Sequence, residues 1–106
     1  MSRYLFEVSY TPEGARGLLK EGAMGRRALV EGIVEGLGGT LESFDFAFGD
    51  HDVYVVAEAP GHVDAAAVSL AVAASGAARI KTVVLLTAEE MDAATQRSVG
   101  YRPPGA

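Results

Sequence analysis

The residues best suited to chemistry gather in one polar turn. His51 lies between Asp50 and Asp52, in a Gly49–Asp52 turn that joins two apolar segments, and Tyr54 follows shortly after. Carboxylate neighbours stabilise a protonated imidazole and hold its ring, which suits general acid–base work near neutral pH. We therefore name His51 and Asp52 as candidate catalytic residues, with Tyr54 as a group that polarises a substrate carbonyl or hydroxyl.

The same residue types also have a structural interpretation. A histidine between aspartates in a hairpin turn is commonly a solvated residue with no catalytic part. Tyr10 is the remaining catalytic candidate, yet tyrosines in strands commonly pack in the core with a hydrogen-bonded hydroxyl. Both alternatives stay open for His51 and for the tyrosines.

A metal ion is a third use of the turn. Asp50, His51 and Asp52 offer suitable ligand atoms, but consecutive residues rarely point at one ion, and His62 has no companion at metal-binding spacing. We assign no metal ligands and expect no cofactor, because phosphate-binding, dinucleotide-binding and nucleophile-elbow motifs are also missing from the sequence.

The first half of the chain predicts a strand and a broken helix. Residues 3–10 alternate between apolar and polar side chains, as a half-buried strand does. Thr11-Pro12-Glu13 then starts a helix. Glycines at positions 22 and 25 weaken it, so we expect a short piece around Leu18 and a longer one over residues 25–37.

The second half predicts two hairpin strands, a helix, a strand and a last short helix. Alanine and valine at helical spacing mark the longer helix, and a capping-box pattern, Thr87-Ala88-Glu89-Glu90, opens the short one. The predicted ranges are, in order, 40–48, 52–59, 63–74, 79–86 and 87–95.

This order, βαββαβ, predicts an α+β ferredoxin-like plait with a four-stranded antiparallel sheet and both long helices on one face. The other face would expose apolar residues, and a second subunit would cover it to give a dimeric α+β barrel. The residues concerned are Leu5, Val56, Val83 and Leu85. We expect one domain over residues 1–95 and a tail over 96–106, which is either disordered or an arm around a partner.

Each face of the predicted sheet offers a candidate site. Aromatic side chains on the helix-facing side form either a plain core or a ligand pocket; those assigned to the pocket are Tyr4, Phe6, Phe44 and Phe46. Glu7 and Glu58 lie on the other face, where Asp45 and Lys81 also point. Because buried carboxylates need partners, they form either ion pairs across a dimer interface or a polar site inside a barrel.

Composition limits the partners and the compartment. The 106 residues include no cysteine, which favours a reducing cytoplasm, and neither a signal peptide nor a membrane-spanning stretch is visible. The net charge is −5, and no lysine or arginine occurs from Ala28 to Ala78. Nucleic acid is therefore not an expected partner. The acidic hairpin serves either solubility or the binding of a cation.

The chain resembles the GYD-domain family, small bacterial proteins of the dimeric α+β barrel type. The matching features are YLFEVSYTPEG near the start, the double glycine before residue 40, the G-x-x-D turn at Gly49–Asp52, and a strand that closes on Glu58-Ala59-Pro60. The resemblance covers roughly residues 3 to 92. The family usually has an aromatic residue before the turn aspartate, where this chain has His51.

The resemblance implies a homodimer or higher homo-oligomer and no agreed reaction. Histidine and tyrosine act together in some cofactor-free cyclases of this barrel superfamily. The first hypothesis is therefore a barrel that binds an apolar or aromatic small molecule, with cofactor-free acid–base catalysis of isomerase, cyclase or monooxygenase type as an extension. The second is a non-catalytic module for oligomerisation or partner binding, and the third is a metal-binding protein.

Overall fold

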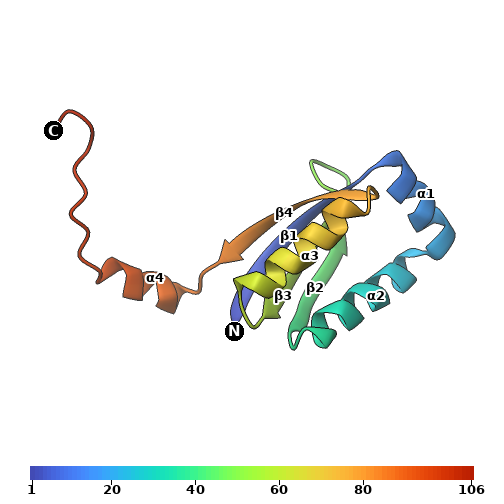
Figure 1. Cartoon of the computed structure of the whole chain (residues 1–106), viewed down its shortest axis with the longest axis horizontal. Helices are drawn as coiled ribbons and strands as arrows, with labels where there is room; N and C mark the ends of the chain where they lie inside the picture. The colour runs from blue at the N-terminus through green and yellow to red at the C-terminus, as the bar shows by residue number, and fades with distance from the viewer.

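The computed structural model describes residues 1–106 and contains one four-stranded antiparallel sheet (Figure 1). The strand order is β2-β3-β1-β4, and every neighbouring pair is antiparallel. The strands are β1 (Ser2–Tyr10), β2 (Thr40–Phe46), β3 (Val53–Ala59) and β4 (Ala78–Leu85). With helices between β1 and β2 and between β3 and β4, this order confirms the predicted ferredoxin-like plait.

The helices begin and end where local sequence signals predict. They are α1 (Pro12–Glu21), α2 (Ala23–Gly36), α3 (His62–Ala74) and α4 (Ala88–Thr95). The Thr11 hydroxyl caps α1 by accepting a hydrogen bond from the Gly14 N–H at 3.2 Å. Gly22 separates α1 from α2 with a φ of 91°, a value that L-residues with side chains rarely adopt. The predicted break in the first helix is therefore confirmed.

The alternation along β1 sorts its side chains between the two faces of the sheet. Tyr4 and Phe6 are buried beneath the helices, in a core that also contains Val53 and Val55 of β3. Leu5 is paired with Val56 and Val83 on the bare face. The predicted division of the sheet into a helix-covered face and an uncovered face is thus present.

The strand predicted over residues 40–48 is too long at its C-terminal end. Strand pairing stops at Phe46, and Phe48 lies fully exposed in the loop that follows. This loop is closed by a hydrogen bond of 2.8 Å from the Ala47 N–H to the Asp52 carbonyl, so Phe48 is in the turn and not in the strand. A bulge between Leu41 and Ser43 also shifts the register of β2.

The last helix and the residues after it stand apart from the sheet and its three helices (Figure 1). Both hydrogen bonds of the predicted capping box are present, between Thr87 and Glu90. The radius of gyration is 16.8 Å, whereas a compact chain of this length has about 13 Å. We call residues 1–86 the body and residues 87–106 the C-terminal arm. None of the helices has the length and apolar character needed to cross a membrane.

Candidate functional site

A cavity of about 630 Å³ lies between the helix-covered face of the sheet and helices α1, α2 and α3. Its floor comes from the inward-facing residues of the strands, and its walls come from the apolar sides of the helices. Among the lining residues are Phe6, Val8, Phe44, Val30, Val34 and Val68. Most of the cavity lining is therefore apolar. The volume of the cavity lies within the range of about 300–1,000 Å³ that small-molecule sites occupy.

Polar groups enter this cavity from α2 and from the end of β1. Tyr10 is half-buried in the wall, and burial raises the pKa of its hydroxyl, an effect that Arg26 partly offsets. At neutral pH the hydroxyl therefore keeps its proton and can donate a hydrogen bond. Arg26 also lines the cavity, and its Nη2 atom contacts Glu21 Oε2 at 2.7 Å. The cavity thus combines an apolar interior with a polar edge, to which Tyr10 and Arg26 contribute donors and the acidic residues Glu13 and Asp64 contribute acceptors.

His51 occupies a second, polar cluster on the bare face of the sheet. Its Nε2 atom lies 2.8 Å from Glu7 Oε2, and its Nδ1 atom lies 3.1 Å from Ser9 Oγ. The side chains of His51 and Glu7 are only 14% and 22% exposed. Because a carboxylate only accepts hydrogen bonds, Nε2 carries a proton and Nδ1 faces the serine hydroxyl. The ring is therefore held at both nitrogens, which a solvated turn histidine would not be.

The residues next to His51 have separate roles. The Asp52 carboxylate accepts a hydrogen bond from the Tyr10 N–H at 2.8 Å, while the Asp52 N–H donates to the Val8 carbonyl at the same distance. Asp52 thus fastens the hairpin turn to β1. The Tyr54 ring meets the His51 ring edge to face, with 5.7 Å between their centres. Asp50 is exposed and offers its backbone carbonyl to Ser9 Oγ at 3.4 Å.

The structure divides the sequence-predicted site residues between the two faces. His51 and Tyr54 share the bare face with Glu7, the cross-strand partner of Tyr54. Tyr10, Phe6 and Phe44 line the cavity on the other face. The sheet therefore stands between the histidine and the cavity, and the two do not form one site.

Two residues of the predicted pocket lie outside the cavity lining. Phe46 is 41% exposed at the end of β2 and stacks edge to face on Phe44. Tyr4 is buried, and its hydroxyl is hydrogen-bonded to Nδ1 of His62 at 2.6 Å. Both Tyr4 and His62 line a separate groove of about 480 Å³ between α3 and β4.

Sequence reasoning missed the partners that hold these polar side chains. The part played by Ser9 could have been predicted, because the alternation of side chains along β1 places Ser9 on the same face as Glu7. The contact of His62 with Tyr4 had none, since it depends on the β1–β3 register, which pairs Ser2 with Ala59 and so brings the start of α3 beside β1. No three His, Asp or Glu side chains gather closely enough to hold a metal ion.

The family profile of the GYD domain matches residues 4–95, from β1 through α4. The chain belongs to the GYD-domain family. No curated protein and no solved structure matches it significantly. Membership of this family agrees with the α+β fold but names no reaction. A function for this GYD domain is therefore inferred from the geometry of its sites.

In this GYD domain the aspartate of the G-x-x-D turn, Asp52, has a structural part, because it joins the turn to β1. In the segment Gly49–Asp52, the residue before the aspartate is His51, whose ring bonds to Glu7 and Ser9. The aspartate itself binds backbone N–H of β1. The turn is therefore held to β1 in two ways. His51 contacts Glu7 and Ser9 through its side chain, and the Asp52 carboxylate accepts a hydrogen bond from the Tyr10 N–H, as the backbone carbonyl of a paired strand would.

Proposed function

We propose that this GYD domain binds an apolar small molecule in the cavity between its sheet and its helices. The observation that carries the proposal is a space of about 630 Å³, partly open to solvent, that is lined mainly by apolar side chains of the sheet and three helices. Protein interiors are normally packed without voids of this size. A molecule that fills this space would replace the contacts that the lining side chains otherwise lack.

The edge of the cavity defines the polar end of such a ligand. The Tyr10 hydroxyl can donate a hydrogen bond to a ligand, and the Arg26 guanidinium, although paired with Glu21, adds further N–H groups. A molecule with one acceptor group on an aromatic or aliphatic body matches this arrangement. Acid–base turnover of that ligand would use Tyr10, because His51 and Tyr54 lie beyond the sheet.

Replacing Val68 with tryptophan tests the cavity. Val68 lines it from α3, so the larger ring would occupy ligand space. We expect the affinity for an apolar fluorescent probe, anilinonaphthalene sulfonate, to fall at least about tenfold. The measurement is a fluorescence titration of the folded protein, with circular dichroism to verify the fold.

Val63 offers a matched control on the same helix. Its side chain is exposed and does not line the cavity, so Val63→Trp should bind the probe as the parent protein does. Equal affinity in the Val68→Trp and Val63→Trp proteins, or no binding by the parent protein, would contradict the proposal.

The bare face of the sheet supports a second function, assembly into a homodimer. Leu5, Val56 and Val83 lie together there, beside the His51–Glu7 pair. A patch in which apolar residues adjoin a hydrogen-bonded pair of polar side chains is typical of a surface that a partner covers. A second sheet with the same residues would complete the dimeric α+β barrel that the sequence predicts.

Val56→Asp tests this assembly, because it places a charge in the middle of the apolar patch. We expect association to weaken at least about tenfold, measured by light scattering over a range of concentrations. Leu19→Asp, on the exposed side of α1, is the control and should leave the mass unchanged. A parent protein that stays monomeric at all concentrations would rule out the dimer.

A further inference from the structure

Helix α3 is apolar on its outer side as well as on the side that faces the sheet. Its sequence, HVDAAAVSLAVAA, has one acidic residue, and Ala65 is its only fully buried residue. Val63 and Leu70 are 84% and 71% exposed. Helices that are apolar all round are normally covered all round. The outer side of α3 therefore has the composition of an interface.

This outer side forms one wall of the groove between α3 and β4. Leu70 and Ala73 line it from the helix, and Ile80 and Val84 line it from the strand. Its three hydroxyl groups already have partners within the body, because Ser69 is hydrogen-bonded to Thr82 and Tyr4 to Nδ1 of His62. The groove, of about 480 Å³, thus offers a mainly apolar surface.

The C-terminal arm has apolar side chains of its own that are not covered, because it makes almost no contacts with the body. All its residues are exposed, among them Met91, Val99 and Tyr101. Helix α4 has eight residues, whereas isolated helices shorter than about 12–15 residues are marginal in water. Its capping box specifies where the helix begins, and tertiary packing must supply the remaining stability.

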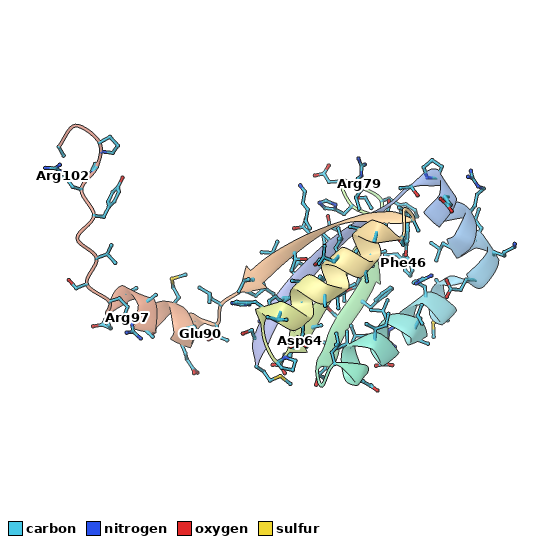
Figure 2. The ribbon with its side chains drawn as sticks, in the orientation of Figure 1. Phe46, Asp64, Arg79, Glu90, Arg97 and Arg102 are labelled. Atoms are coloured by element: carbon cyan, nitrogen blue, oxygen red, sulfur yellow. The ribbon has the colours of Figure 1, made fainter.

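We propose that the C-terminal arm of one copy docks in the α3–β4 groove of a second copy. Ala88, Met91 and Ala94 recur along one side of α4 and give the arm a narrow apolar stripe. Glu90 and Asp92 border this stripe, and Glu89 lies opposite it. In the structure the arm leaves the end of β4 and points away from the body of its own chain (Figure 1). Figure 2 shows Glu90, Arg97 and Arg102 along the arm, outside the body.

Charge favours another copy of the chain as the partner. The body holds eleven acidic and seven basic residues, a net charge of −4. The arm as a whole carries −1, because Glu89, Glu90 and Asp92 lie on α4, but its last residues, 96–106, carry Arg97 and Arg102 and no acid, a net charge of +2. A basic tail is attracted to an acidic body. The same tail lacks the cluster of basic residues that nucleic acid or an anionic membrane requires.

Because the chain has no cysteine, engineered cysteines give a clean test. Met91→Cys on the arm and Leu70→Cys in the groove are prepared as separate proteins, mixed and oxidised. We expect a disulfide-linked heterodimer on a non-reducing gel, because the two positions lie in contact only between copies. Met91→Cys mixed with Leu19→Cys, on the exposed side of α1, is the control and should give at least about tenfold less heterodimer.

The double variant, Met91→Cys with Leu70→Cys, separates docking between copies from docking within one chain. A disulfide formed only within single chains would overturn the proposal, as would the absence of heterodimer in the mixture. Neither outcome depends on the cavity or on the bare sheet face. In the cysteine-free protein, Leu70→Asp and Met91→Asp should each weaken association at least about tenfold, and Leu19→Asp should not; equal association in all three would also refute the docking.

Discussion

Replacing Phe6 with alanine is expected to lower the free energy of unfolding by about 4 kcal/mol. Phe6 is 6% exposed and belongs to the core cluster with Tyr4 and Val55. It also lines the cavity, so its loss would enlarge a space that is already unfilled. Because the β-sheet cannot collapse into that space, the lost contacts are not replaced, and the free energy of unfolding falls by their full contribution.

Phe48→Ala is the control for this prediction. The same substitution removes a fully exposed ring from the hairpin loop, so the free energy of unfolding should change by less than about 0.5 kcal/mol. Urea denaturation followed by circular dichroism measures both variants. A loss of equal size in the two proteins would show that the phenylalanines share one environment, contrary to the structure.

Gly14→Ala is expected to lower the free energy of unfolding by about 3 kcal/mol. A Cβ atom at Gly14 would lie 1.9 Å from the carbonyl oxygen of Ala77, a backbone atom that cannot rotate away. That oxygen already accepts a hydrogen bond from the Thr11 N–H at 3.0 Å. The start of α1 would therefore have to move off the turn before β4, which would also open one end of the cavity.

Gly17→Ala, one turn further along α1, should have the opposite effect. Beyond its neighbours along the helix backbone, no atom lies within 4 Å of the position where its Cβ would be. Alanine is a better helix former than glycine by about 1 kcal/mol, so this variant should be slightly more stable than the parent. The thermal denaturation midpoint should fall in the Gly14→Ala protein and rise slightly in the Gly17→Ala protein. A midpoint for Gly14→Ala at or above that of the parent would show that α1 does not approach Ala77 so closely.

Local patterns predicted most of the fold because each depends on neighbouring residues. The alternation in β1, the proline and threonine at the start of α1, and the capping box at Thr87 all involve groups within a few positions of one another. Phe48 was assigned to a strand by the same alternation, and there the pattern failed. The pairing with β3 ends at Phe46, and strand ends are set by the partner strand and the turn.

The sites depend on distances along the chain that no local pattern encodes. His51 lies 42 residues from Ser9 in the sequence, and Tyr4 lies 58 residues from His62. The sequence identified His51, Tyr54 and Tyr10 as residues capable of chemistry but could not show that the sheet separates the first two from the third. That separation follows from strand register, because a shift of one residue exchanges the two faces.

By itself the sequence determined the order of strands and helices, the plait and the membership of the GYD-domain family. Tertiary structure alone decided which side chains meet, that a cavity remains beneath the helices, and that the C-terminal arm leaves the body. The physical reason is the separation along the chain of the residues that interact. Hydrogen bonding and hydrophobic periodicity act over a few residues and can be recognised in a single chain, whereas packing joins distant segments whose relative positions the whole fold sets.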